Sequence, residues 1–545
     1  MIRQMSNAIR WHAAMALTLA LFGLGVPLPV AAQLKIVVRA DHPMGPVNPN
    51  IFGNNISWVQ NADNMWDAKQ HAFYPEDAKA LRDLHAPLIR YPGGLYGNQF
   101  HWATSLPHNR RAQGRADSDT WEMPDFGTME FYQASEQFGF VPMFIFNLSN
   151  GTPEEAAALV AYLNGQLEDD RPIGKDAHGE DWRTVGEWAR QRAADGHPAS
   201  FHARYFELGN ENWNTAREGG QTVATYIKAA VATDIAVKRI DPTVRTAAVA
   251  YHQNKPGTLD GAAGATQPWN ESLLDGLQNS PGHTINAIVN HYYTSTQGMT
   301  PPDRYAAEVL TEYVLIEAGL DAFIHQVHER YTRQPTEIWW TEWARSAIHI
   351  NDHNLQDALY TADIGLNTYG TRPEITIGNY FDIGDGGRGM FFAGNGIHRP
   401  YGTVVRFPEF EAASLILKTL KGVRVATETQ APTFARPDRG NPPQVRVLAA
   451  LDGGERMLRL FIVNKANYAL AGLITLEGCT VGGPIRMHQV GGSGLDYGAN
   501  NFDPQAPRRV AEVEHTLPQM SSPLRLEIPG PAFVVLEIPI GTKGN

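Results

Sequence analysis

The stretch "ARYFELGNENW" (residues 203–213) combines a strand-like apolar run with two glutamates. Aromatic residues favour strands, whereas a carboxylate in a buried strand costs free energy unless it is paired or does chemistry. Glu207 lies inside the run, and Glu211 follows its end, directly after Asn210. The stretch therefore predicts a buried strand that delivers polar groups to a site at its carboxyl end.

Seven further runs of the same kind share the first 420 residues. They are 51–58, 86–94, 140–150, 243–251, 284–294, 337–344 and 373–383. Segments with apolar residues at helical spacing lie between most of them, at 75–85, 152–165, 222–241, 304–331 and 356–370. Alternating strands and helices favour parallel pairing with right-handed crossovers, and eight such units close a (β/α)8 TIM barrel. We therefore expect an α/β fold with a catalytic barrel over residues 33–420.

The pattern changes after about residue 420. Short strand-like runs with Gly and Pro turns follow, such as "RMLRLFIVNKA" (456–466) and "AFVVLEIPI" (532–540), with almost no helical period. They predict a C-terminal β-sandwich over residues 421–545. The run "LKIVVRAD" (34–41) precedes the barrel, so segment 33–45 is assigned either to the barrel region or to a strand that joins the sandwich.

The first 32 residues have the pattern of a signal peptide. Arg3 and Arg10 precede a short apolar core at 13–26, and small residues around Ala32 suit cleavage. The core is short for a membrane span, although an anchored first helix is the alternative. We expect an exported protein, periplasmic or extracellular, with no membrane association once the signal is removed.

Composition excludes some functions. The formal net charge of −12 argues against a groove for nucleic acid, which needs a surplus of Lys and Arg. The chain has one cysteine, Cys479, so no intrachain disulfide is possible, and its strand-like surroundings predict a buried, inert thiol.

Polar groups gather where the predicted strands end, which is the working face of a TIM barrel. Two of them are carboxylates from different strands, Glu211 and Glu342. Cleavage of a glycosidic bond needs one protonated carboxyl for the leaving oxygen and one charged carboxylate for the anomeric carbon or for water. Arg90 and Tyr293 are placed to serve the charged one, and Glu207, deeper in its strand, is predicted to pair with an arginine such as Arg90.

Four motifs, taken in order, carry a resemblance to a known family. "RYPGG" (90–94), "ELGNE" (207–211), "NHYY" (290–293) and "TEW" (341–343) resemble the retaining glycoside hydrolases of clan A, most closely the family 51 α-L-arabinofuranosidases. The likeness covers residues 34–545, because that family also has a C-terminal β-sandwich.

The resemblance implies roles for the strand-end residues. Glu211 would be the general acid/base and Glu342 the nucleophile. Asn210 would bind the sugar hydroxyl next to the anomeric carbon, and Arg90 would keep the nucleophile ionised. His291 and Tyr293 would flank the nucleophile and the sugar.

Two more residues are candidates for substrate contact. Trp213 is a candidate platform for a sugar ring, with core packing as the alternative. Asn98 continues the loop after "PGG" and is a candidate for lining the pocket. We expect no metal and no cofactor, because neither an HxxxH motif nor a Cys/His cluster accompanies His291.

The chain departs from the family pattern at two positions near the sugar. Ser57 stands where the family usually has a glutamate, and Leu95 stands where it tends to have an asparagine. These departures leave the paired carboxylates in place and bear on the identity of the sugar.

The predicted function is that of a retaining glycoside hydrolase acting on plant or microbial polysaccharide or oligosaccharide, most closely an α-L-arabinofuranosidase. The alternatives in the same clan are a β-xylosidase, a β-glucuronidase and an endoglucanase. Two alternatives come from other classes: a non-catalytic carbohydrate-binding barrel, and a polysaccharide lyase.

Overall fold

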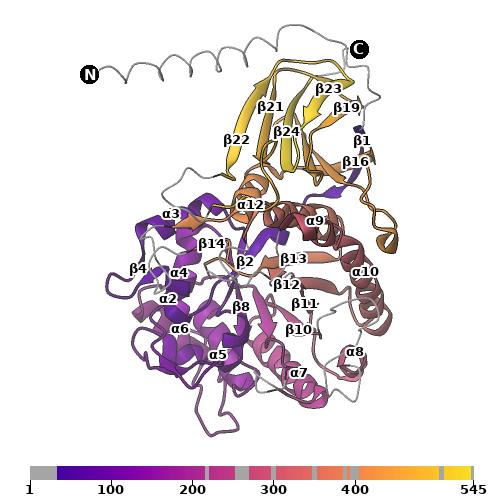
Figure 1. Ribbon diagram of the computed structural model, residues 1–545. Helices are drawn as coiled ribbons and strands as arrows, with labels where there is room; N and C mark the ends of the chain where they lie inside the picture. Colours follow the sequence, from indigo (N-terminus) through magenta and orange to yellow (C-terminus); the bar gives the residue numbers. More distant parts are fainter. Residues whose placement is uncertain are drawn as a thin grey trace, which may run out of the picture.

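The structure is a computed structural model that describes residues 34–214, 220–251, 269–295, 302–346, 353–384, 389–392, 404–501 and 509–541. Its lower half in Figure 1 is a closed barrel of eight parallel strands. In chain order these are β2 (Gly53–Asn55), β5 (Leu88–Tyr91), β8 (Val141–Phe146), β9 (Tyr205–Leu208), β10 (Arg245–Val249), β11 (Ala287–Ser295), β12 (Glu337–Ser346) and β13 (Ile375–Tyr380). Each lies in one of the eight predicted runs, or extends it by one or two residues, so the predicted TIM barrel is confirmed.

Helices surround the barrel, and several match the predicted segments. Those that overlap the predicted segments are α3 (Pro75–Leu84), α5 (Pro153–Asn164), α7 (Val223–Ile240), α9 (Pro302–Leu310), α10 (Tyr313–Arg330) and α11 (Leu355–Asp363). Others were not predicted: α4 (Thr128–Phe138), α6 (Val185–Ala194), α8 (Trp269–Asn279) and α12 (Pro408–Thr419).

Two predicted helices differ from the observed ones. The single helix expected over 304–331 is divided into α9 and α10, because the junction is held by tertiary contacts. There Glu312 accepts a hydrogen bond from the Tyr292 hydroxyl at 2.9 Å and pairs with Arg439 at 3.3 Å. The helix expected over 356–370 changes after Asp363 into a π-helix, η5 (Ile364–Tyr369), where Gly365 packs tightly against the Phe52 ring.

Short elements form the loops at the barrel ends. The 3-10 turns are η1 (Pro49–Phe52), η2 (Gly94–Gln99), η3 (Trp102–Ser105) and η6 (Pro437–Arg439). The small strand pairs are β3 (Trp66–Asp67) with β4 (Ala72–Phe73), β6 (Gln113–Gly114) with β7 (Trp121–Glu122), and β14 (Phe391–Phe392) with β15 (Val405–Arg406).

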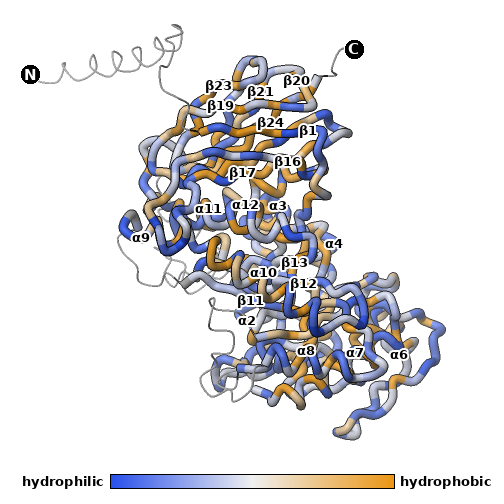
Figure 2. Tube along the Cα trace, turned by 90° about the vertical axis from the view of Figure 1, so that its right-hand side faces the viewer, coloured by the Kyte–Doolittle hydropathy of each residue, from blue (hydrophilic) through white to orange (hydrophobic). Residues whose placement is uncertain are grey.

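The second domain is a curled ten-stranded sheet above the barrel in Figure 1. Its strands are β1 (Leu34–Pro46), β16 (Val423–Gln430), β17 (Val445–Asp452), β18 (Met457–Asn464), β19 (Leu470–Glu477), β20 (Thr480–Val481), β21 (Ile485–Gly491), β22 (Glu512–Leu517), β23 (Leu524–Ile528) and β24 (Ala532–Gly541). β1 pairs antiparallel with β16 and parallel with β19, so the first described strand lies in this sheet. Hydrophobic stretches run along β17 and β24 (Figure 2), where β24 is buried from Ala532 to Ile538.

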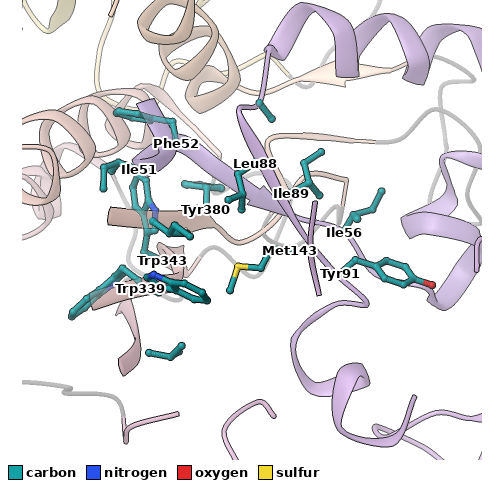
Figure 3. Close-up of a cluster of buried hydrophobic side chains, with 14 of the residues drawn as sticks. Ile51, Phe52, Ile56, Leu88, Ile89, Tyr91, Met143, Trp339, Trp343 and Tyr380 are labelled. Carbon is teal, nitrogen blue, oxygen red and sulfur yellow. The ribbon is translucent and has the colours of Figure 1, made fainter. Parts of the chain in front are cut away.

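The barrel core is built from large side chains of neighbouring strands. Figure 3 shows Tyr91 of β5, Met143 of β8, Trp339 and Trp343 of β12 and Tyr380 of β13 in one buried cluster. Parallel strands covered on both faces need such near-continuous apolar runs. This packing fixes the strand ends that carry the polar groups.

Buried charges join the two domains. The ammonium group of Lys465, at the end of β18, lies 2.7 Å from the Asp363 carboxylate of α11 and 4.2 Å from the centre of the Tyr313 ring. Burial lowers the pKa of Lys465 to about 8, although the Asp363 charge opposes this shift. The barrel therefore meets the sheet through a specific ion pair as well as apolar packing.

Cys479 is buried in the second domain. Within the described ranges, none of the helices combines the length and apolar character needed to cross a bilayer. The predicted signal peptide lies outside the described residues.

Candidate active site

Arg90, at the end of β5, is the hub of the polar groups inside the barrel mouth. Its guanidinium is fully buried and donates to Glu207 through Nε at 2.5 Å and Nη2 at 3.0 Å. Nη1 donates to Glu342 at 3.0 Å and to the Asn55 side chain at 2.9 Å. Burial alone would lower the pKa of Arg90, but the charges of Glu207 and Glu342 outweigh burial and raise it. Glu207 is thus the paired structural carboxylate that the sequence predicted.

Glu342 is held from three sides. Arg90 donates to Oε1, and the Tyr293 hydroxyl donates to Oε2. The third side is the backbone of Gly94, where an added Cβ would lie 2.9 Å from Oε1 and where φ is +42°. Only glycine fits such a position without strain, which explains the second glycine of "RYPGG".

A β-bulge in β12 sets the direction of the Glu342 side chain. Val289 and His291 of β11 are two residues apart. Their partners in β12, Trp339 and Glu342, are three residues apart. The register with β13 shifts at the same place. A bulge of this kind re-aims side chains. It allows both Thr341 and Glu342, neighbours in sequence, to contact groups of the same site.

His291 connects the two carboxylates. Its Nδ1 lies 2.9 Å from Oε1 of Glu211 and 3.6 Å from Oε2 of Glu342, and its Nε2 lies 3.0 Å from the Thr341 hydroxyl. Burial lowers the pKa of His291, but the Glu342 charge and the hydrogen bond with Glu211 raise it by more than burial lowers it, so the net shift is upward. The site therefore favours a charged imidazolium between the two acids.

The two acids face each other at short range. One carboxylate oxygen of Glu211, one of Glu342 and a ring nitrogen of His291 all lie within 4.8 Å of one another. Three such groups could hold a metal ion, but Arg90 and Tyr293 already donate to the two oxygens of Glu342. A fixed guanidinium charge beside the cluster opposes a cation there, so the donor set fits a pair of acids better than a metal centre.

Asn210, which precedes Glu211, is almost fully buried. Its side-chain oxygen accepts a hydrogen bond from Nη2 of Arg90 at 2.6 Å. The strand-end turn thus joins the same network as Glu342, and the structure brings together Arg90, Asn210, Glu211, His291, Tyr293 and Glu342.

The other two predicted contact residues lie differently. Asn98 is fully buried, and its amide bonds the backbone of Asn210. Trp213 is half-buried, and its ring meets that of Tyr251 edge to face at 4.5 Å. Trp213 keeps an exposed part, as a sugar platform requires, whereas Asn98 has no exposed surface to offer a sugar.

Ser57, where the family pattern has a glutamate, binds a carboxylate from another position. Its hydroxyl donates to Oδ1 of Asp63 at 2.5 Å, and its backbone N–H donates to Oδ2 at 2.9 Å. Asp63 comes from the turn α2 (Val59–Asn64), in which the φ angles of residues 60–64 are all positive. A left-handed turn of five non-glycine residues is costly, and such strain is typical of functional sites. Leu95 is half-buried in η2.

Sequence reasoning missed three polar residues of the site: Asn55, Thr341 and Asn212. Asn55 accepts from Arg90, Thr341 contacts His291, and Asn212 donates to Asn98. Two adjacent asparagines inside the buried run "IFGNNISW" were a signal for Asn55. Thr341 had no such signal in the sequence. In a regular strand its side chain would point to the face opposite that of Glu342, and only the bulge brings both residues to the site.

Comparison with known proteins finds α-L-arabinofuranosidases among the similar sequences and among the similar structures. The model of the "Alpha-L-arabinofuranosidase 1 domain" family matches residues 80–308. A probable α-L-arabinofuranosidase C from Aspergillus clavatus is 27% identical over 221 residues, which are 39% of this chain and 40% of that protein. An intracellular exo-α-L-arabinofuranosidase from Bacteroides ovatus is 24% identical over 297 residues, 52% of this chain and 51% of that protein. The chain thus matches about two fifths to half of the length of these relatives.

Solved structures extend the likeness of fold to nearly the whole chain. The α-L-arabinofuranosidase of Thermotoga maritima, solved with arabinose, has a TM-score of 0.74 at 19% identity and covers 92% of this chain and 99% of its own. The family 51 enzyme of Xanthomonas axonopodis pv. citri has a TM-score of 0.72 at 16% identity, covering 93% and 100%. In sequence over residues 80–308 and in fold over nearly all of its length, the chain is similar to the family 51 α-L-arabinofuranosidases, as its motifs predicted.

Proposed function

We propose that the protein is a retaining glycoside hydrolase that works by double displacement. One observation carries the proposal: oxygens of Glu211 and Glu342 lie within 4.8 Å of each other, from two different strand ends. Retaining glycosidases place their two carboxyl groups about 5–5.5 Å apart, whereas inverting enzymes leave about 6.5–9.5 Å for a water molecule. The short separation favours direct attack by one carboxylate on the sugar.

In the first step, Glu342 attacks the anomeric carbon. The bond between that carbon and the leaving oxygen breaks, and the carboxyl proton of Glu211 passes to the leaving oxygen. The products are the departing alcohol, a glycosyl ester on Glu342 and a Glu211 carboxylate. Neutralising one of two neighbouring carboxylates removes the repulsion that kept the other protonated, which favours this proton transfer.

In the second step, water enters where the alcohol left. Glu211 takes a proton from the water, whose oxygen attacks the anomeric carbon while the ester bond to Glu342 breaks. The sugar leaves with its original anomeric configuration, Glu342 is again a carboxylate, and Glu211 is again protonated. Two inversions at one carbon give net retention.

The groups around Glu342 prepare it for attack. Arg90 and Tyr293 donate hydrogen bonds to its two oxygens, which fixes the orientation of the carboxylate. Nδ1 of His291 faces both acids from one side, 2.9 Å from Glu211 and 3.6 Å from Glu342. These donors lie on packed strands, so they need little reorganisation during the reaction.

The substrate that we propose is a polysaccharide or oligosaccharide of plants or microbes that carries α-L-arabinofuranose. The names of the similar proteins support this sugar. Ser57 and Leu95 stand where the family pattern has other residues, and Ser57 is bonded to Asp63, which favours testing other glycosides of the clan beside this one.

The test is a panel of chromogenic glycosides with the wild type, Glu211→Ala and Glu342→Ala. We expect fastest release from the α-L-arabinofuranoside, with both variants losing most activity. On an activated substrate, azide should restore product with the original anomeric configuration for Glu211→Ala and with the inverted one for Glu342→Ala. Faster turnover of a β-xyloside or β-glucuronide would reassign the sugar. Inverted product from the wild type, or binding without cleavage, would overturn the mechanism.

We also propose that residues 1–32 are a signal peptide and that the mature protein is periplasmic or extracellular. The pattern of Arg3, Arg10 and the apolar core at 13–26 supports this. The amino-terminal sequence of the protein recovered after expression with an intact export system tests it. Cleavage near Ala32 is expected, and an unprocessed chain in the cytoplasm would contradict it.

A further inference from the structure

Glu211 stands on a turn with an unusual backbone. Its φ is +42°, in the left-handed region that non-glycine residues rarely adopt, and Gly209 two residues earlier has φ +86°. The turn is also tight, because a Cβ on Gly209 would lie 2.0 Å from Oδ1 of Asn212. Such a conformation persists only where the surrounding structure holds it in place.

Asn98 supplies that support. It lies in η2, the segment after β5, and its side chain is fully buried. Its Oδ1 accepts a hydrogen bond from the backbone N–H of Asn210 at 3.0 Å and from the Asn212 amide at 3.3 Å, while its Nδ2 donates to the backbone carbonyl of Asn210. One side chain therefore clamps both backbone groups of the residue directly before Glu211.

The same residue before Glu211 is also fixed through its side chain. Arg90 donates to Oδ1 of Asn210 at 2.6 Å, so Asn210 is held from the backbone by Asn98 and from the side chain by Arg90. The direction of the Cα–Cβ bond of Glu211 follows from the backbone orientation of this turn. A tilt of the turn would move the Glu211 carboxyl relative to the leaving oxygen.

Segment η2 reaches the other acid as well. Gly94, four residues before Asn98, packs its backbone against Oε1 of Glu342. Gly97 lies against Ile145 of β8, where an added Cβ would come within 2.9 Å of the side chain. A single short segment thus contacts the nucleophile at one end and the turn of the acid/base at the other.

We infer that Asn98 is a positioning residue for the general acid/base Glu211 and has no contact with the sugar. This inference rests on the proposed function of Glu211. It predicts a defect of a particular kind: loss of Asn98 impairs proton transfer to the leaving group and leaves attack by Glu342 largely intact.

The test uses arabinofuranosides, or the best glycoside of the panel, with leaving groups of increasing basicity: dinitrophenyl, nitrophenyl and methyl. A good leaving group needs no proton, so its kcat/KM reports attack alone, whereas a methyl glycoside requires general acid catalysis. Because misplacing a catalytic group costs up to about 100-fold, Asn98→Ala should lose about 10- to 100-fold in kcat/KM on the methyl glycoside and little on the dinitrophenyl glycoside. In the pH profile of kcat/KM for Asn98→Ala, the limb that reports the ionisation of Glu211 should flatten.

A matched control variant exists at the other end of β9. Asn164 clamps the backbone N–H and carbonyl of Ala203 in the same way, both at 2.8 Å, far from the strand end that carries Glu211. Asn164→Ala should lower the thermal midpoint as Asn98→Ala does, without any change in leaving-group dependence. If Asn98→Ala does not fold, Asn98→Asp keeps the shape and the acceptor for the Asn210 N–H, and loses the donor to the carbonyl.

Glu211→Ala distinguishes a failure of the proposed role of Glu211 from a failure of the proposed role of Asn98. If Glu211→Ala shows no dependence on the leaving group, the proposed function of Glu211 fails. If Glu211→Ala shows the dependence and both Asn98 variants lose activity equally on all three substrates, or on none, Asn98 has only a structural role and the present inference is wrong.

Discussion

His291 lies between the two acids of the site, with its Nδ1 atom 2.9 Å from the Glu211 carboxyl. The opposite ring nitrogen lies 3.0 Å from the Thr341 hydroxyl, so both nitrogens have partners that accept from an imidazolium. Burial acts against this charge, but Glu342 and Glu211 together raise the pKa of His291 above 6.5. The ring is therefore part of the charge balance of the site.

This balance predicts how stability depends on pH at His291. Because the pKa of His291 in the folded state is raised above its unfolded value, its contribution is fully present below about pH 6.5 and is lost as pH rises through the folded pKa. The difference in free energy of unfolding between the wild type and His291→Asn should thus shrink with rising pH. Urea unfolding at a series of pH values measures it. A difference that grows with pH would mean that the buried ring is neutral.

The close approach of the Gly94 backbone to Glu342 predicts the effect of a substitution on the nucleophile. A methyl group there would lie 2.9 Å from Oε1 of Glu342 and would also strain a backbone at φ +42°. Gly94→Ala should therefore displace Glu342 and lower kcat by about 100-fold or more, as small displacements of reacting groups do.

The control for Gly94 is Gly139, which also has a positive φ, of +76°, but nothing within 4 Å of an added Cβ. Gly139→Ala should cost about 1 kcal/mol of stability through the backbone and leave kcat unchanged. Steady-state kinetics and thermal unfolding of both variants are the measurements. Equal kcat values for the two variants would show that Gly94 does not shape the site.

The barrel could be predicted because its signals are local. Apolar runs such as 140–150 and 203–213 alternate with amphipathic helices, and this alternation of strand and helix repeats along the chain. The place of β1 had no such local signal, because its register with β16 joins residues almost 400 positions apart, as between Val37 and Glu428. A pairing over that distance leaves no periodic pattern in the residues around the strand.

The residues of the site could be predicted where polar side chains stand at strand ends. They could not be predicted where the backbone geometry determines which groups are in contact. Glu211 and Glu342 followed from the strand pattern, and the structure brings them together. The clamp by Asn98 uses backbone atoms, which every residue has, so no residue pattern reports it. The contact of Thr341 depends on a bulge that strict alternation does not include.

The network around Arg90 predicts a large loss of stability on disruption. Arg90→Met would leave Glu207 buried without its guanidinium partner, and breaking a buried ion pair costs about 3–5 kcal/mol. The matched control is Arg245→Met at the opposite end of the barrel, where the pair with Glu337 is partly exposed and should be worth about 0–1 kcal/mol. Urea unfolding of both variants compares them, and equal losses would show that the buried network contributes no special stability.

The second domain predicts a separate pH dependence. On β21, His488 lies 3.0 Å from Glu512 of β22 and 3.3 Å from Glu537 of β24. Hydrogen bonds with these two carboxylates raise the pKa of His488 to about 9. The stabilisation should be complete below about pH 6.5 and should disappear as pH rises through 9, and it should contribute on the order of 1–2 kcal/mol to the free energy of unfolding after solvent screening.

His488→Gln removes this stabilisation, so the free energies of unfolding of wild type and variant should converge between these pH values. The control variant is His515→Gln, which replaces an exposed histidine on β22. A constant difference between wild type and His488→Gln across this range would mean that the histidine is not charged by its neighbours.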